Sequence, residues 1–368
     1  MAKRKVNGAG SIVFDAERNC FRAHCTTHTG RRISKRFSTA KEAQEWVTKT
    51  TAAVLNNEFV EPSKMTVGAW LLSYLKDYKA QTVAPKTMDL YTLLAGKCAP
   101  IADVRLQSVT APMIQSFYTE LQNTQSVEMV RKVHHFLHAA FEKARRIGLV
   151  TYNALASVDP PKRSCKPEIE TFTPAEVGAI YKSAQEYSSG RYFPLILLAF
   201  SSGARMGELL ALFWDCVDFE KDEITIKRNL TVTTSAGTVI GAPKTKAGFR
   251  TISIPHTAST RLRELQRSSE LVRMNGPVFI TSAGTPFTPR NITRAWAQIL
   301  KCADVPHKKF HVIRHTHATE LLAAGAPIAD VSRRLGHSKI SHTLDLSGHA
   351  MPRMDKLISL KVASIFSK

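Results

Sequence analysis

The sequence lacks the long apolar runs, the secretory leader and the cysteine pairs that mark membrane proteins and exported proteins. No stretch of about 18 or more apolar residues occurs, so we expect no membrane span. Residues 1–5 are basic and lack the apolar core of a signal peptide, which leaves a nuclear address or a DNA-contacting arm open. The six cysteines form no CxxC pair. We therefore expect free thiols in a reducing cytoplasm, with neither disulfides nor zinc.

Acidic residues are also scarce in this chain. Fifty-one lysines and arginines stand against 30 aspartates and glutamates, which leaves a net charge of +21. Such an excess is expected of a protein that neutralises many backbone phosphates. A basic surface that only keeps the protein soluble is the alternative. The length of 368 residues is enough for two or three domains, each with its own core.

Residues 1–60 are expected to form a small module of three strands and one helix. The strand-like runs are residues 11–14, 20–25 and 31–37. A helix should follow from about residue 39 or 40 to residue 56, with Ser38 or Thr39 as its cap and Glu42 as the capping-box partner. A basic face of such a ribbon can enter a groove of DNA, although exposed strands are often basic in any case. The candidate DNA-binding residues here are Arg22, Arg31, Arg32, Lys35 and Arg36.

Two further domains are predicted after a short hinge. Between residues 64 and 158 apolar residues recur at helical spacing, which predicts a compact helical domain with one basic side. Its candidate DNA-binding residues are Arg131, Lys132, Arg145 and Arg146. A proline-rich linker precedes the third domain, residues 171–368, whose first helix opens on a capping box of Thr173 and Glu176. We thus predict a multidomain α+β fold: a small three-stranded sheet with a helix, a helical domain, and a mainly helical domain with a small antiparallel sheet.

Polar residues gather between residues 309 and 349 in a pattern that favours an anionic substrate. His311, Arg314 and His315 fall at i, i+3 and i+4, so they share one helix face. A second helix should end on a glycine that places the next histidine beyond the helix end. The residues of this second group are Gly336 and His337, followed by Ser347 on a last short helical turn. Imidazoles and a guanidinium that converge on one point suggest that the anion is a phosphate.

Cationic side chains earlier in the third domain complete the predicted site. Arg205 lies between two glycines after an apolar helix, and Glu208 could hold its side chain in place. Lys244 and Lys246 lie in residues 242–250, which we interpret as a hairpin tip between strands. A lysine there can reach over a bound backbone, but a solvated turn lysine fits equally well.

The order Arg205, Lys244, His311, Arg314, His337 resembles that of the tyrosine recombinase (phage integrase) family. The segment SSGARMGELLALFWDCVDF is similar to the family pattern TGLRxGELLxLxWxDID, and LGHSKISHTLDLS is similar to LGHSSIxTTLxxY. The resemblance is strong from residue 171 to the end. The helical domain resembles the family's core-binding domain, and residues 1–60 resemble the arm-binding domain of integrases from temperate phages and conjugative transposons.

The resemblance implies a reaction without metal or other cofactor. In this family a tyrosine attacks a DNA phosphodiester, giving a 3′-phosphotyrosyl bond and a free 5′-hydroxyl. Arg205 and Arg314 would bind the nonbridging oxygens, whose charge grows in the transition state. Lys244 would protonate the leaving 5′ oxygen, and His311 would take the proton of the nucleophile. His337 would donate to a phosphate oxygen.

The resemblance also implies several partners. Family members act on double-stranded DNA with core and arm sites, through a Holliday junction, as a homotetramer. In such an assembly the amphipathic segment at residues 352–366 would pack on the next subunit. An excisionase or a DNA-bending protein is a further expected partner, and a membrane is not.

One position departs from the family pattern, because Ser347 stands where the nucleophilic tyrosine is expected. All eight tyrosines lie at or before Tyr192, so no shift of register supplies another. Serine is too short to replace a phenol that projects from a helix, and its hydroxyl pKa lies far above the value of about 10 for tyrosine. We therefore expect a chain that binds DNA and assembles but does not cleave. Because the other site residues are present, we interpret Ser347 as an engineered or recently acquired loss.

Three alternatives compete with this interpretation. A metal-dependent hydrolase could use His311, His315 and His317, but the chain has no HExxH motif or nearby carboxylate, and Arg314 would repel a cation. A non-enzymatic architectural DNA-binding protein could share the fold. A serine nucleophile at position 347 is the third.

Overall fold

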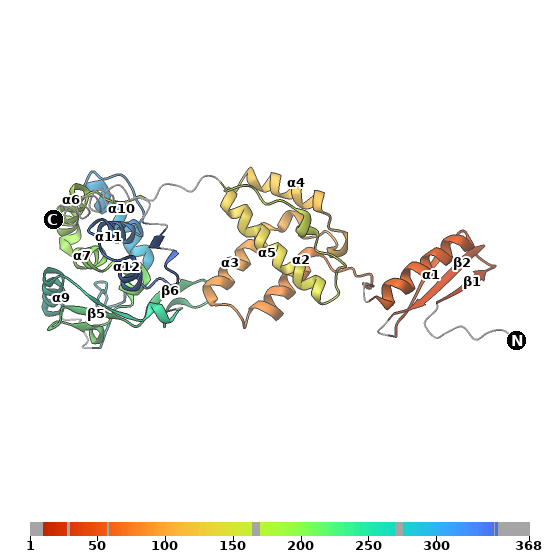
Figure 1. Ribbon diagram of the computed structural model, residues 1–368, viewed down its shortest axis with the longest axis horizontal. Coiled ribbons are helices and arrows are strands. Elements are labelled where there is room, and N and C mark those ends of the chain that lie inside the picture. The colour runs from red at the N-terminus through yellow and green to blue at the C-terminus, as the bar shows by residue number, and fades with distance from the viewer. Residues whose placement is uncertain are drawn as a thin grey trace, which may run out of the picture. The chain divides into compact units, whose positions relative to one another are not determined.

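The computed structural model (Figure 1) contains two compact units, Met1–Cys165 and Lys166–Lys368. It describes residues 10–27, 30–56, 59–163, 170–243, 245–268, 275–341 and 343–344. Lys244, Ser347 and the predicted helix at residues 352–366 lie outside the described residues. The division falls within the linker that the sequence predicted. The finer division into three domains stays a prediction.

The first unit begins with a three-stranded antiparallel sheet packed on one helix (Figure 1). The strands are β1 (Ser11–Asp15), β2 (Cys20–Thr26) and β3 (Arg32–Phe37), in that order, and the helix is α1 (Ala40–Leu55). Thr39 caps α1, because its side chain accepts a hydrogen bond from the backbone N–H of Glu42. Ala23, Ala43 and Val47 form the small buried core between sheet and helix.

A second, larger core in the same unit is entirely helical. The helices are α2 (Val67–Ser73), which continues into a π-helical turn at Tyr74–Lys79, α3 (Pro85–Lys97), α4 (Ala111–Gln122) and α5 (Val127–Arg146). The stripe on α5 that includes Val133, Leu137 and Ala140 is fully buried. Trp70 packs against this stripe and donates from Nε1 to the carbonyl of Ala140 at 3.0 Å. The helical pattern predicted for residues 64–158 is confirmed.

The second unit has a large core and a smaller cluster of Ala318, Leu322, Val331 and Leu335, both built mainly from helices. These are α6 (Pro174–Glu186), α7 (Phe193–Ser202), α8 (Met206–Leu210), α9 (His256–Ser268), α10 (Pro289–Cys302), α11 (Val312–Ala323) and α12 (Ile328–Leu335). Both hydrogen bonds of the predicted Thr173–Glu176 capping box are present at the start of α6. None of the helices in the described part of the chain has the length and apolar character that a membrane crossing requires.

Two small antiparallel sheets complete the second unit and confirm the predicted fold class. One contains β4 (Val217–Asp218), β5 (Glu223–Ile226) and β8 (Arg250–Ser253), and the other contains β6 (Asn229–Thr233) and β7 (Gly237–Gly241). The prediction that residues 242–250 form a hairpin tip is wrong. β7 pairs with β6, so the segment around Lys244 connects two different sheets. β7 is hard to recognise in the sequence, because it has only three apolar or β-branched residues between two glycines, and glycine is typical of turns.

Candidate functional site

Three arginines of the second unit meet at the C-terminal end of α12. The last carbonyls of a helix have no partner within the helix, and this end carries a partial negative charge, so it attracts cationic donors. Three consecutive carbonyls each accept a hydrogen bond from a different arginine: Arg334 from Arg250 at 2.6 Å, Leu335 from Arg314 at 2.7 Å, and Gly336 from Arg205 at 3.3 Å. One helix end thereby places three guanidiniums side by side.

Arg205 is oriented by Glu208, which follows it on α8. The Nη1 of Arg205 donates to Oε1 of Glu208 at 2.9 Å, and the backbone N–H of Arg205 donates to Oε2 at 2.9 Å. Burial alone would raise the pKa of this carboxyl, which is only 3% exposed, but the donors of Arg250 and Arg205 outweigh burial and lower it. The Arg205 side chain itself stays 40% exposed, so it remains accessible to a ligand.

Arg314 is held more deeply, with only 3% of its surface exposed. Besides the carbonyl of Leu335, its guanidinium binds the carbonyl of Gly203 at 2.9 Å. Gly203 has a φ of +64°, and a Cβ there would lie 2.5 Å from His317, so this turn requires glycine. Burial, followed by the nearby Arg205, lowers the pKa of Arg314 to about 9. Both causes disfavour the cation, and an anion bound beside it would offset them by favouring the charged form.

The histidines next to this cluster are neutral at physiological pH. His311 caps the start of α11, and its ring packs edge-on against that of His315 with centroids 4.7 Å apart. Part of the His311 side chain is exposed. Burial of the rest, followed by the nearby His315 and Arg314, lowers the pKa of His311 to about 4. Burial and then Arg314 also lower the pKa of His315, whose Nδ1 has no partner among the described residues. A neutral imidazole at position 311 can accept a proton.

His337 lies directly beyond α12, as the sequence predicted. Gly336 ends the helix in the left-handed region with a φ of +68°, and the backbone N–H of His337 donates to the carbonyl of Ser332 at 3.1 Å. The Nδ1 of His337 lies 2.8 Å from the hydroxyl of Thr343, which orients the ring. Of the predicted catalytic residues, the structure thus brings Arg205, His311, Arg314 and His337 together.

The sequence did not predict a role for Arg250 of this cluster. It also did not predict the contact between the neighbouring side chains of Arg334 and His317. His317 faces away from His311: its Nδ1 lies 2.7 Å from the carbonyl of Phe200, so it must donate, and Nε2 then accepts from Arg334 Nε at 3.1 Å. Within the described ranges no group of three or more histidine, cysteine or acidic residues could hold a metal ion. No local motif marks Arg250, Arg334 or His317 in the sequence, because their contacts form only in the folded unit.

The predicted DNA-binding residues of the sheet do not all lie on one face. Arg22 and Arg36 are cross-strand partners, and Arg32 lies two pairs further along the same side. Lys35 is paired with the buried Ala23 on the helix side, and its amine lies 5.4 Å from the ring of Phe37. The single basic face expected from the sequence therefore does not include Lys35. Successive side chains of a strand point to opposite faces, so the alternation along β3 could have shown that Lys35 and Arg36 lie on different faces.

The basic residues of the helical core differ among themselves. Arg145 and Arg146 both bind Glu142, at 2.8 and 3.2 Å, and the hydrogen bonds from Arg145 lower the pKa of Glu142 to about 2. Arg131 donates to the carbonyl of Pro161 at 2.6 Å. Lys132 is exposed. Arg31, which precedes β3, also forms an ion pair at the surface, with Glu61 at 3.0 Å.

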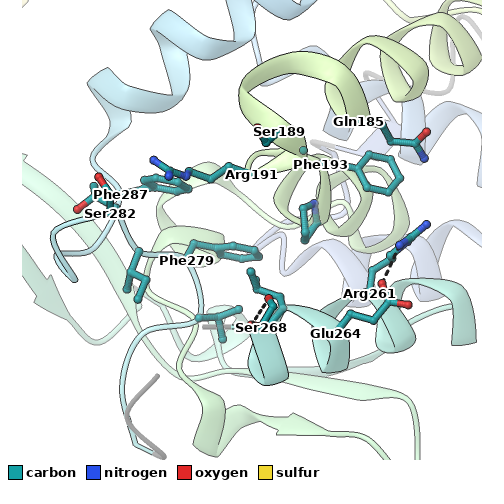
Figure 2. Close-up of a pocket in the computed structure, with 16 residues that line it drawn as sticks. Gln185, Ser189, Arg191, Phe193, Arg261, Glu264, Ser268, Phe279, Ser282 and Phe287 are labelled. Carbon is teal, nitrogen blue, oxygen red and sulfur yellow. Dashed lines mark hydrogen bonds and ion pairs between the residues drawn. The ribbon is translucent and has the colours of Figure 1, made fainter. Parts of the chain in front are cut away.

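An open cavity of about 960 Å³ lies elsewhere in the second unit. Phe279 and Phe287 from the segment before α10 line it, together with Arg261 and Glu264 from α9, which form an ion pair at 2.7 Å (Figure 2). None of the predicted catalytic residues that the structure describes lines this cavity. The arginines that could hold an anion lie instead at the end of α12.

Fold and site together define a mainly helical protein with a cluster of arginines suited to an anion. Residues 170–346 match the model of the phage integrase family, and the match ends one residue before Ser347. The chain is 31% identical to a tyrosine recombinase XerC-like protein of Caldanaerobacter subterraneus over 88% of this chain and 90% of that protein. It is 28% identical to the ICEBs1 integrase of Bacillus subtilis over 45% of this chain and 46% of the relative.

Solved structures show the same fold at lower identity. The Tn1549 transposon integrase in complex with a circular intermediate DNA matches with a TM-score of 0.69 and 20% identity over 80% of this chain and 99% of that chain. A lambda integrase tetramer bound to a Holliday junction matches with a TM-score of 0.61 and 15% identity over 95% and 97% of the two chains. The chain belongs to the phage integrase family of tyrosine recombinases.

Proposed function

We propose that this chain is a site-specific DNA integrase that binds and assembles on its DNA sites but does not cleave them. The observation that carries the proposal is the cluster at the end of α12, where Arg205 and Arg314 are held beside neutral His311 and the turn of His337. Arg205 and Arg250 share one carboxylate, Glu208, whereas the hydrogen bonds of Arg314 go to the carbonyls of Gly203 and Leu335. The excess positive charge favours an anion, and a backbone phosphate meets that requirement.

The residue roles follow the family reaction. Arg205 and Arg314 would bind the nonbridging oxygens of the scissile phosphate and stabilise the charge that develops there. His311, neutral at pH 7, would accept the proton of the nucleophile, and Lys244 would supply a proton to the leaving 5′ oxygen. His337 would donate to a phosphate oxygen. With Ser347 in place of tyrosine, the phosphate would be bound and activated without a nucleophile of adequate reach and acidity.

The larger assembly is proposed by analogy with the relatives. Residues 1–60 would bind arm-type sites, while residues 64–158 and 171–368 would form a clamp around the core site. The lambda integrase structures contain a dimer on a core site and a tetramer on a Holliday junction. A homotetramer of this chain, joined through residues 352–366, would follow the same plan, with an excisionase or DNA-bending protein as accessory partner. Deleting residues 352–366 should leave monomer binding and abolish the higher-order complexes.

The test is a covalent trap. The chain itself first selects its binding site from a pool of random duplexes, and the selected duplex is then nicked at successive positions. Ser347→Tyr should form a protein–DNA adduct that survives denaturing electrophoresis, whereas the unchanged chain should form none. Ser347→Tyr combined with Arg314→Met is the control, and its rate should fall by about 10²–10³-fold.

The alternative is an architectural DNA-binding protein on the same fold. Specific binding without any adduct from Ser347→Tyr, at every nick position, would favour that function. An adduct formed by the unchanged chain would instead indicate a serine nucleophile.

A further inference from the structure

Arg250 is a buried guanidinium that the proposed chemistry does not use. It opens β8, and only 6% of its side chain is exposed. Its acceptors are Oε2 and Oε1 of Glu208 at 2.8 and 3.2 Å, the carbonyl of Gly248 at 3.1 Å, and the carbonyl of Arg334 at 2.6 Å. These acceptors belong to α8, to the segment before β8, and to α12. A single side chain therefore connects three segments that surround the site.

Glu208 is the contact through which Arg250 reaches Arg205. Oε1 of Glu208 accepts from Nη1 of both arginines, at 2.9 Å from Arg205 and 3.2 Å from Arg250. Oε2 accepts from the backbone N–H of Arg205 and from Nη2 of Arg250. A carboxylate held from two sides has one orientation. With Arg250 removed, Glu208 would keep Arg205 as its only cationic partner and could rotate with it.

The second connection runs to the turn that carries His337. Arg250 binds the first of the three carbonyls at the end of α12, and the neighbouring two bind Arg314 and Arg205. A Cβ at Gly336 would lie 2.8 Å from Nη1 of Arg250 and 2.7 Å from the carbonyl of Ala247. The turn is therefore packed directly against Arg250. Any shift of this guanidinium has to move the turn.

We propose that Arg250 is a positioning residue of the phosphate site. It fixes the orientation of Arg205 through Glu208 and the position of the turn that precedes His337, without touching the substrate. The role rests on the proposed function, because the orientation of Arg205 affects a reaction only if Arg205 binds the scissile phosphate. The arrangement itself is a property of the protein without DNA and can be measured there.

The first test observes Arg205 directly in the unchanged Ser347 chain. The Nε–H signal of Arg205 is recorded by NMR with ¹⁵N-labelled arginine and assigned by its loss in Arg205→Lys. In Arg250→Met this signal should shift, and its hydrogen exchange should accelerate by at least about tenfold, because local order is lost. Arg250→Lys should give an intermediate change, since an ammonium keeps the charge but not the fork of donors. An unchanged signal in either folded variant would overturn the proposal.

Arg228→Met supplies the matched control. Arg228 forms a two-pronged pair with Asp215 at 3.0 and 3.1 Å in the same unit and, within the described ranges, has no hydrogen bond to the cluster. Its loss should destabilise the unit without altering the Arg205 signal. If Arg228→Met changes that signal as much as Arg250→Met does, Arg250 acts only through overall stability.

The second test adds the reaction. In the Ser347→Tyr background, Arg250→Met should slow adduct formation at saturating DNA by about 10–100-fold, because small misplacements of catalytic groups have effects of this size. DNA affinity should stay within about threefold, and Arg228→Met should change neither quantity. Equal rates in the two variants would contradict the positioning role. If Ser347→Tyr itself forms no adduct, the proposed function fails, and the NMR result still decides the role of Arg250.

Discussion

The two units hold their arginines in opposite ways. In the second unit Arg250 and Arg314 are 6% and 3% exposed and bind backbone carbonyls and one carboxylate. In the first unit Arg145 and Arg146 are 47% and 70% exposed and share Glu142 at the surface. A buried guanidinium that is hydrogen-bonded to fixed acceptors is held in one position, whereas an exposed guanidinium can adopt many. The first kind suits a reacting phosphate, and the second suits contacts along a DNA backbone that fix register without chemistry.

This difference also determines how the charges contribute to stability. Exposed ion pairs typically contribute little, because water and salt screen them. Buried charges are unfavourable unless they are paired and fully hydrogen-bonded. The cluster at the end of α12 meets that condition with three carbonyls and Glu208. Charge changes should therefore have large effects in the second unit and small ones in the first.

The largest expected effect follows removal of the buried carboxylate. Glu208→Gln should leave Arg205 and Arg250 without a counter-charge and lower the free energy of unfolding by about 3–5 kcal/mol. Urea unfolding followed by circular dichroism measures this. Glu142→Gln is the matched control, since Glu142 also binds two arginines but at the surface, and it should leave stability nearly unchanged. Similar losses in both variants would remove the distinction between the units.

A smaller loss is expected where α12 ends. Gly336→Ala should destabilise through the left-handed backbone, by about 1–3 kcal/mol, and through contact of the new methyl with Ala247 and Arg250. Gly237→Ala isolates the first contribution, because Gly237 has a φ of +63° and a Cβ there would meet no described atom within 4 Å. The difference between the two variants in thermal unfolding reports the crowding. Equal losses would mean that the turn is not packed on Arg250.

The exposed arginines should affect DNA binding more than folding. Removing Arg22 and Arg36 together, as glutamines, should reduce the slope of log K against log salt by about 0.9 for each phosphate that is no longer neutralised. The unfolding midpoint should stay the same. Fluorescence anisotropy at several salt concentrations measures the slope, with Lys35→Gln as the comparison on the opposite face. A flat salt response of the unchanged chain would contradict a phosphate-binding role for either unit.

Both units also share an expected pH dependence of stability. Burial is the main cause that lowers the pKa of His134 and of His317 to about 4, from the ordinary value near 6.5. Between these values the unfolded chain binds more protons, so stability is complete above about pH 6.5 and is lost as the pH falls toward 4. Unfolding free energies at half-unit pH steps test this. A stability that does not change across that window would contradict it.

The local signals in the sequence predicted much of the fold and part of the site. Capping residues such as Thr173 and the helix-ending Gly336 act through neighbouring residues, so spacing alone identified them. Arg250 and Arg334 could not be predicted in this way. Arg250 binds Glu208, 42 residues away, and the carbonyl of Arg334, 84 residues away, and these contacts form only when separate sheets and helices pack. Lys35 was assigned to the wrong face because composition was considered without strand parity.

The central claim is that a complete phosphate site lacks only its nucleophile. Peptide mapping by mass spectrometry of the adduct formed by Ser347→Tyr on nicked duplex tests it most directly. The account predicts a single modified peptide with DNA linked to residue 347 through a 3′-phosphate. Linkage at any other residue, or no linkage on a duplex that the chain binds specifically, would contradict it.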